Sequence, residues 1–455
     1  MVDGADAVGV HELGDDRVAQ RDRAERQRAL RDRRHDLIPG GAHTYSKGDD
    51  QYPVLAPGFI VRGHGCRVWD ADDNEYVEYG MGLRSVTLGH AYAPVVEAAY
   101  RQMLLGENYT RPAAIEVACA ERLLSMLGNG DMVKFAKNGS DATSAAVRLS
   151  RAVTGRDLVA ICADHPFFST GDWFIGTTPM SAGVPSAVQA LTKGFRYNDI
   201  EHLRSLFASH PGQIACVVME AETTESPMPG YLHAVQDLCR AEGALFVLDE
   251  IITGFRWSTG GAQEVHDLDP DLSTFGKAMG NGFAVAALVG RREFMERGGL
   301  HSVGERVFLL STTHGAENHS LAATMQVMTT YVEESVTDDL ALQGERLRCG
   351  VERVVAEAGL ENHVQLVGHP TNLTYVTRDA GGERSQAFRT LFMQELIRRG
   401  ILGPSFVVSR VHDDAVVDRT IEAVSGALEV YGRALTDGVE RHLVGRSVQP
   451  VMRPR

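Results

Sequence analysis

The segment FVLDEIITGFR, residues 246–256, decides the fold, because an apolar run within it ends on two acids. Continuous rather than alternating apolarity is typical of a parallel strand that is covered on both faces. A buried carboxylate is costly unless another group compensates it. Asp249 therefore needs a cationic or hydrogen-bonding partner at the end of this strand.

Two further runs follow the same pattern, LVAICAD at 158–164 and IACVVME at 214–220, and each also ends in an acid. Helical stretches such as YLHAVQDLCRAEG, residues 231–243, lie between the runs, which predicts a doubly wound α/β fold. Ligands of such folds bind beyond the carboxyl ends of the strands. We therefore expect one site to be formed by Asp164, His165, Glu220, Asp249 and Glu250.

The chain has 455 residues, is 44% hydrophobic and carries a formal net charge of -15, which argues against nucleic acid as a partner. Its six cysteines show neither CxxC nor Cys/His metal spacing, so we expect reduced packing residues, no metal site and a cytoplasmic location. The N-terminus lacks an apolar signal region, and no run is long enough to span a bilayer, so no membrane partner is expected.

We expect three parts along the chain. Residues 1–87 form an N-terminal segment with a disordered start up to about residue 15, a charged helix at 17–38 and a hairpin at 65–80. Residues 88–330 form the large domain, and residues 331–455 form a smaller α+β domain. Its candidate strands are VQLVGHPTNLTYVT at 364–377 and SFVVSRV at 405–411.

Four features carry chemistry, although each also has an ordinary structural interpretation. Gly139 and Ser140 open a helix, which suits an anion site or a simple N-cap. Asp249 is either a structural acid or a partner for a ligand cation. Lys277 lies in the apolar, glycine-flanked stretch PDLSTFGKAMGNGF, residues 270–283, where burial would make it a nucleophilic amine rather than a solvated one. The hydroxyl-rich loop STTHGAE at 311–317 precedes another helix.

The four features together suggest one ligand. A phosphate at Gly139 and Ser140, a cationic ring nitrogen at Asp249 and an aldehyde condensed with Lys277 are the three groups of pyridoxal 5'-phosphate. The pyridinium N–H would give Asp249 its compensating charge, and a protonated ring is the better electron sink.

At these motifs the sequence resembles the class III pyridoxal-phosphate aminotransferases of fold type I, closest to the glutamate-1-semialdehyde aminomutase branch. The resemblance covers roughly residues 36 to 430. It rests on IPGG (38–41), LGHAYAPVVEA (88–98), NGSDATSAAVRLSR (138–151), SAGVP (181–185), YND (197–199), LDEIITGFR (248–256), PDLSTFGKAMGNG (270–282) and GILGPS (400–405).

The resemblance implies a large domain with a mostly parallel seven-stranded sheet, and a homodimer with shared active sites. It implies that Lys277 holds the cofactor as a Schiff base, that Asp249 binds the pyridine nitrogen and that Ile251 packs on one ring face. It further implies that Gly139 and Ser140 hold the phosphate and that Thr312 reaches the cofactor of the neighbouring subunit. Glu220 is a further cofactor-binding candidate.

The sequence departs from the family pattern at three places, one beside the cofactor and two on the substrate side. CADHPFFS at 162–169 replaces Tyr-His-Gly, so either His165 or Phe167 is the candidate for stacking on the cofactor. No acid follows Pro404–Ser405, where the aminomutase branch has its Phe-Glu-Ala insertion. PGGAHTYSK at 39–47 replaces PGGVNSPVR, which makes His43, Thr44 and Tyr45 substrate-binding candidates and disfavours glutamate semialdehyde itself.

The sequence thus predicts an aminotransferase that moves an amino group from a donor such as glutamate to a ketone or aldehyde acceptor. The hydrogen-bonding loop suits a polar acceptor such as a keto-sugar. The alternatives are an intramolecular aminomutase, a pyridoxal-phosphate-dependent epimerase and, from a different class, a non-catalytic binding protein.

Overall fold

The computed structural model describes residues 29–315 and 317–453 of the chain. Residues 29–37 are helical, as expected for the second half of the charged helix at 17–38. The rest of that helix and the expected disorder before residue 15 lie outside the described residues.

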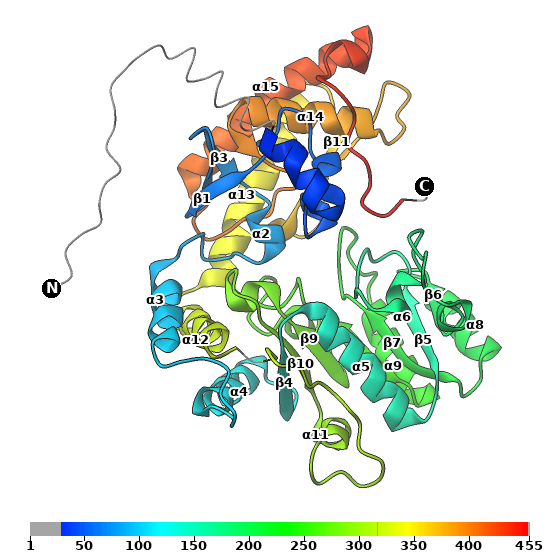
Figure 1. Ribbon diagram of the computed structural model, residues 1–455. Helices are drawn as coiled ribbons and strands as arrows, with labels where there is room; N and C mark the ends of the chain where they lie inside the picture. The colour runs from blue at the N-terminus through cyan, green and yellow to red at the C-terminus, as the bar shows by residue number, and fades with distance from the viewer. Residues whose placement is uncertain (1–28, 316, 454–455) are drawn as a thin grey trace, which may run out of the picture.

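A seven-stranded mixed sheet forms the centre of the large domain (Figure 1). Its strands, in spatial order, are β4 (Met132–Ala136), β10 (Ala286–Gly290), β9 (Leu272–Phe275), β8 (Leu245–Asp249), β7 (Ile214–Met219), β5 (Leu158–Cys162) and β6 (Thr192–Phe195). β10 runs antiparallel to both of its neighbours, and the other pairs are parallel. The predicted mostly parallel α/β sheet of fold type I is confirmed.

Helices cover both faces of this sheet, which explains why its strands are continuously apolar. On one face α5 (Gly139–Thr154) packs against alternate residues such as Val159 and Ile161. On the other face α8 (Ile200–Ser209) and α9 (Tyr231–Glu242) pack against the intervening ones, such as Ala160. The strand ends are therefore the edges at which side chains can reach a ligand.

A second sheet joins the two ends of the chain. β1 (Ile60–His64), β2 (Arg67–Asp70) and β3 (Glu75–Glu78) form an antiparallel meander, and β13 (Ile401–Leu402) pairs with β3 in parallel. The hairpin expected at 65–80 is confirmed as β2 and β3. The division of the chain at residues 87 and 330 stays a prediction.

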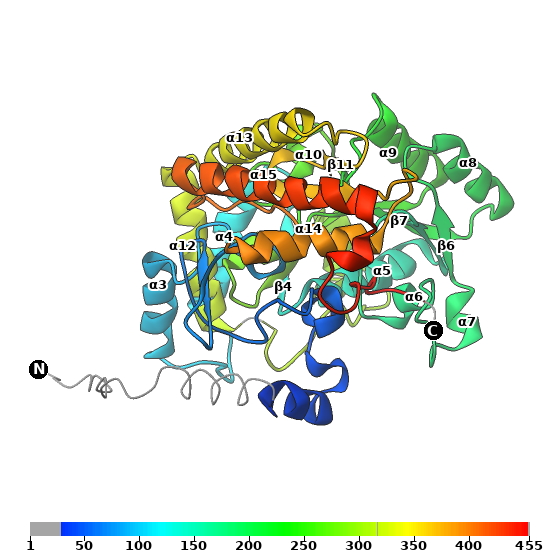
Figure 2. The ribbon, with the colours of Figure 1, turned by 90° about the horizontal axis from the view of Figure 1, so that it is seen from above.

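Long helices build the rest of the molecule. Three of them lie side by side in the C-terminal part (Figure 2): α13 (Val336–Glu357), α15 (Asp414–Asp437) and α14 (Gln386–Arg398). α12 (Asn318–Glu333) packs against α3 (Ala93–Met103) and α4 (Ala114–Leu127). The shorter helical turns are α2 (Met81–Arg84), α6 (Asp172–Ile175), α7 (Ser186–Gln189), α10 (Ala262–Val265), α11 (Arg292–Met295), η1 (Pro39–Gly41), η2 (Tyr45–Lys47), η3 (Asp49–Gln51), η4 (Lys277–Gly280), η5 (Glu296–Gly298), η6 (Pro370–Asn372) and η7 (Val439–Arg441).

One strand prediction in the C-terminal part is wrong. Residues 364–377 form the antiparallel pair β11 (Val364–Val367) and β12 (Thr374–Thr377), but residues 405–411 form no strand. The N–H groups of Phe406, Val407 and Arg410 donate to Leu373, Tyr79 and Thr87, respectively. The segment is buried and apolar, yet its backbone bonds go to three separate partners, so no ladder forms.

Among the described residues, no helix is long and apolar enough to cross a membrane.

Candidate active site

Asp249 lies at the carboxyl end of β8 with only 4% of its surface exposed. Its Oδ1 accepts hydrogen bonds from the N–H of Ile251 at 3.0 Å and from Oγ1 of Thr274 at 2.9 Å. Thr274 stands directly opposite Asp249 on β9, so the sheet register fixes this pair. Oδ2 accepts no hydrogen bond from the described residues, which leaves one oxygen of a buried carboxylate available to a ligand.

Lys277 follows β9 and begins the turn η4 with a left-handed φ of 44°. Burial lowers the pKa of its amine well below the ordinary value of 10.5. The charges of Glu220 and Asp249 oppose this lowering, while that of Arg84 adds to it. A larger share of Lys277 is therefore the neutral, nucleophilic amine than for a solvated lysine.

Glu220 follows β7 directly and is 3% exposed. It lies beside Asp249, because the preceding residues Met219 and Leu248 are paired in the sheet. Burial and the negative charge of Asp249 raise the pKa of its carboxyl. Its N–H donates to Nδ1 of His165 at 3.1 Å, so the neutral histidine carries its proton on Nε2. Burial lowers the pKa of His165 to about 4, and Nε2 has no hydrogen-bond partner among the described residues.

The N-terminus of α5 supplies an anion site. Asn138 caps the helix, and the N–H groups of Gly139 and Ser140 make no hydrogen bond to any described residue. Oγ of Ser140 accepts from the N–H of Thr170 at 3.1 Å, which leaves its own proton free to donate. Free N–H groups, a hydroxyl and the helix dipole together suit a phosphate.

Ile251 connects the anion site to Lys277. A Cβ placed on Gly139 would lie 2.9 Å from Cδ1 of Ile251, and one placed on Gly276 would lie 3.0 Å from the same atom. The side chain of Ile251 therefore sits between the start of α5 and the residue before Lys277. The structure thus brings Asp249, Lys277 and Gly139 together around Ile251.

Other expected site residues lie apart from this group. Glu250 is fully buried, and its carboxylate accepts hydrogen bonds from the N–H groups of Ala262 at 2.9 Å and Gln263 at 2.6 Å. Its carboxylate oxygens are therefore not available to a ligand beside Lys277. The carboxylate of Asp164 accepts from the N–H of Tyr197 at 2.7 Å. Glu250 thus holds the first turn of α10, and Asp164 holds the loop at Tyr197.

The remaining candidates are exposed. Phe167 is 44% exposed and meets Phe174 edge to face, whereas His165 is buried. His43, Thr44 and Tyr45 lie at the surface, and no hydrogen bond in the described part of the chain links them to Lys277 or Asp249. Thr312 is exposed as well. Their roles stay predictions.

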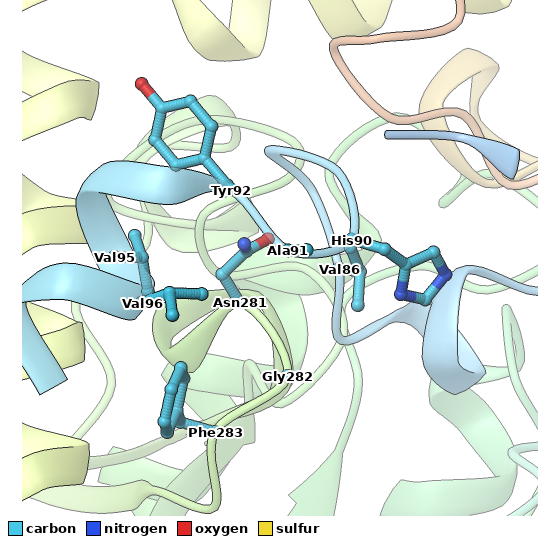
Figure 3. A pocket seen from close by; sticks show the side chains of 9 residues that line it. All are labelled: Val86, His90, Ala91, Tyr92, Val95, Val96, Asn281, Gly282 and Phe283. Carbon is cyan, nitrogen blue, oxygen red and sulfur yellow. The ribbon is translucent and has the colours of Figure 1, made fainter. Parts of the chain in front are cut away.

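A cavity of about 230 Å³ opens next to the Lys277 turn (Figure 3). Asn281, Gly282 and Phe283 form one wall, and residues 86–96 form the other. Figure 3 shows Tyr92 and Phe283 on opposite sides of Asn281. Lys277 and Asp249 do not line the cavity, so it adjoins the candidate active site and is not the site itself.

Residues 46–369 match the family model described as class-III aminotransferase. The chain belongs to this family. The match includes Lys277, Asp249 and the start of α5, which are the residues that the geometry brings together.

Relatives of this class-III aminotransferase agree with the assignment. The chain is 31% identical over 434 residues to a glutamate-1-semialdehyde 2,1-aminomutase from Desulfitobacterium hafniense, with 88% of this chain and 97% of the relative covered. Its fold is similar to the PLP internal aldimine form of the FumI protein of Sphingopyxis sp. MTA144, with a TM-score of 0.83, 26% identity and coverage of 91% and 98%. It is also similar to an omega-transaminase from Sphaerobacter thermophilus, with a TM-score of 0.81, 25% identity and coverage of 90% and 98%.

The protein is accordingly a transaminase whose cofactor is pyridoxal 5'-phosphate. The residues present fit this group. A buried acid with an unused oxygen suits a ring cation, a buried lysine with a lowered pKa suits an aldehyde, and a helix N-terminus with free N–H groups suits a phosphate.

One charged residue at this site escaped the sequence analysis. Arg84 precedes the segment whose N–H groups, at Thr87 and Leu88, donate to Asn281 at the end of the Lys277 turn. Its positive charge lowers the pKa values of Lys277 and Glu220. Its position in MGLRS offers no recognisable signal, because the left-handed turn that places it there has only one glycine.

Proposed function

We propose that this aminotransferase moves an amino group from a donor such as glutamate to a separate ketone or aldehyde acceptor, in two half-reactions. The convergence of Lys277 and Asp249 at adjacent strand ends carries this proposal. Pyridoxal phosphate, when bound, supplies the electron sink for the carbanion at the amine-bearing carbon. Asp249 holds the ring proton, and Lys277 moves the proton on the reacting carbon as general base and then as general acid.

The acceptor that we favour is a polar carbonyl compound such as a keto-sugar. The support is the loop of His43, Thr44 and Tyr45, whose side chains are exposed and rich in hydrogen-bonding groups. The loop stands where the aminomutase branch has PGGVNSPVR, so the substrate-side chemistry differs while the cofactor residues are kept.

Intramolecular amino transfer is the second candidate, because the curated relatives are named glutamate-1-semialdehyde 2,1-aminomutase. Pro404–Ser405 runs on without the acid of that branch, which disfavours glutamate semialdehyde as the substrate. Epimerisation at an amine-bearing carbon is a third possibility that the same cofactor chemistry allows.

Mixing the purified holoenzyme with glutamate and recording the cofactor absorbance separates these reactions. Conversion to the pyridoxamine form, with release of 2-oxoglutarate, supports transfer from an external donor. Conversion with a diamine but not with glutamate would favour the aminomutase. Exchange of the substrate's carbon-bound proton without either conversion would favour the epimerase.

We also propose a cytoplasmic homodimer in which Thr312 completes the neighbouring subunit's phosphate site. The support is that Thr312 is exposed and follows a segment with three exposed apolar residues, Leu300, Val303 and Phe308. Such exposed apolar surface is typical of an interface.

Subunit mixing tests the shared site. Lys277→Ala and Thr312→Asp are each expected to be inactive, because one lacks the amine and the other repels the phosphate. A mixed dimer holds one intact site, since Lys277 comes from one subunit and Thr312 from the other. Recovery of up to about a quarter of wild-type activity is expected after random pairing. No recovery in verified mixed dimers would remove Thr312 from the site.

A further inference from the structure

Residues 81–84 adopt an unusual backbone just before a segment that is bonded to the Lys277 turn. Asn281, which ends that turn, accepts hydrogen bonds from the N–H groups of Thr87 and Leu88, both at 3.0 Å. Met81, Gly82, Leu83 and Arg84 all have positive φ values, of 39°, 58°, 58° and 74°. Residues other than glycine rarely adopt this backbone conformation, because their Cβ then crowds the following carbonyl oxygen. Strain of this kind persists only where the surroundings enforce it, and it gathers at functional sites.

A fully buried arginine enforces the turn. Nη2 of Arg256 donates to the carbonyl oxygen of Arg84 at 3.1 Å. Its Nη1 donates to the carbonyl oxygens of Thr371 and Val408, both at 3.0 Å. Arg256 thus ties the strained turn to two segments of the C-terminal part, and the backbone of Arg84 is held from several sides.

Within the described part of the chain, one of the three guanidinium nitrogens of Arg84 makes a hydrogen bond and the other two make none. Nε donates to Oδ1 of Asn372 at 2.7 Å. Among the described residues, Nη1 and Nη2 make no hydrogen bond, and no carboxylate comes within ion-pairing distance of the guanidinium. Arg84 is half-buried, and burial lowers the pKa of its guanidinium, so an anion bound at Nη1 and Nη2 would stabilise the charged form.

We propose that Arg84 binds a carboxylate of the amino donor, through Nη1 and Nη2, and that Asn372 positions it. The inference rests on the proposed transfer from an external donor and narrows that donor to amino acids. The open edge of the guanidinium presents two parallel N–H groups, which match the two oxygens of a carboxylate.

The wild-type holoenzyme provides the first test through glutamate and its two monoamides. Glutamine lacks the distal carboxylate and isoglutamine lacks the α-carboxylate, while size and amine are kept. We expect one of these amides to react at least 100-fold more slowly than glutamate, measured as kcat/KM for conversion of the cofactor to its pyridoxamine form. Equal rates for all three donors would overturn the proposal.

Arg84→Asn is the matching variant, because asparagine tolerates positive φ better than other non-glycine residues. The 100-fold preference for the carboxylate should disappear in this variant, mainly through KM, while an amine without a carboxylate, such as n-butylamine, reacts within about threefold of wild type. Asn372→Ala should raise KM for glutamate about tenfold and leave the amine unaffected. Arg353→Asn, at an exposed position on α13, serves as the control.

The outcomes separate this inference from the proposed function. Equal losses for glutamate and n-butylamine in Arg84→Asn would show a structural role and overturn the inference. If the wild-type enzyme accepts simple amines but no amino acid as donor, the inference about Arg84 is overturned and the proposed transamination stands. If Arg84→Asn does not fold, Arg84→Gly decides in its place, since glycine adopts the φ of 74° without strain and loss of the amide discrimination is expected there as well. Failure of every donor in the wild type would remove the proposed function and the inference with it.

Discussion

Oγ1 of Thr274 donates a hydrogen bond of 2.9 Å to Oδ1 of Asp249 across two adjacent parallel strands. The bond occupies Oδ1 and fixes the orientation of the carboxylate, so Oδ2 of Asp249 stays available to a ligand at the end of β8. Burial raises the pKa of Asp249, while the nearby charge of Lys277 and its hydrogen bonds lower it. A ring cation at the free oxygen would add to these favourable contacts and keep the acid ionised.

Asp249→Asn should fold normally and lose most of its activity. Asparagine keeps an acceptor for Thr274 and nearly the same volume, so packing survives, but the charge that holds the ring proton is lost. We expect kcat to fall at least 100-fold, about 3 kcal/mol of transition-state stabilisation.

Glu250→Gln is the matched control, because Glu250 is equally buried at the same strand end but accepts from the N–H groups of Ala262 and Gln263. This variant should lose thermal stability and keep near wild-type turnover per folded site. Wild-type turnover in Asp249→Asn would show that Asp249 is only structural.

Gly139→Ala should weaken cofactor binding. The new methyl group would lie 2.9 Å from Cδ1 of Ile251 and would displace that side chain from its place between the anion site and Lys277. We expect Kd for pyridoxal phosphate to rise about tenfold, or about 1.4 kcal/mol, in an equilibrium titration of the apoenzyme.

Gly432→Ala provides the comparison, because no atom of the described residues lies within 4 Å of a Cβ at that position in α15. Alanine in a helix with open space should stabilise the fold by about 0.5–1 kcal/mol and leave Kd unchanged. Equal Kd values in Gly139→Ala and wild type would contradict the role given to Ile251.

Glu220→Gln should shift the pH dependence of cofactor loading towards lower pH. The carboxylate of Glu220 raises the pKa of Lys277 and so partly offsets the lowering by burial. Without that charge the pKa falls further, and the neutral amine that reacts with the aldehyde is present at lower pH. Rates of loading into the apoenzyme, measured from pH 6 to about 10, should show a lower midpoint than in wild type.

The control for this shift is Glu201→Gln, at an exposed position on α8. The ionisations of pyridoxal phosphate itself are the same in every variant, so the difference between midpoints reports on Lys277. A midpoint that rises in Glu220→Gln would contradict the electrostatic role of Glu220.

The sequence could predict the strands and the acids at their ends, because continuous apolarity and the carboxyl-end rule concern local pattern and topology alone. Asp249 and Glu220 were predicted in this way, whereas Lys277 was predicted from its apolar, glycine-flanked stretch. The same rule could not tell that Glu250 accepts from the first N–H groups of α10 and Asp164 from the N–H of Tyr197, since that depends on where these segments lie in space.

Tertiary contacts account for the two larger failures. The strand expected at 405–411 has the right apolarity, but its N–H groups bond to Leu373, Tyr79 and Thr87 in separate segments. Arg84 gave no signal, because its left-handed turn is imposed by Arg256, which lies 172 residues away in the chain.

Trapping the cofactor on the protein tests the central claim, that Lys277 is the residue that carries it. Borohydride reduction of the holoenzyme followed by peptide mapping should place the cofactor on the peptide that contains Lys277, at one cofactor per chain. Lys277→Ala should show no such label and no turnover, whereas Lys134→Ala, at an exposed position on β4, should behave as wild type. A label on any other lysine, or turnover in Lys277→Ala, would contradict the account.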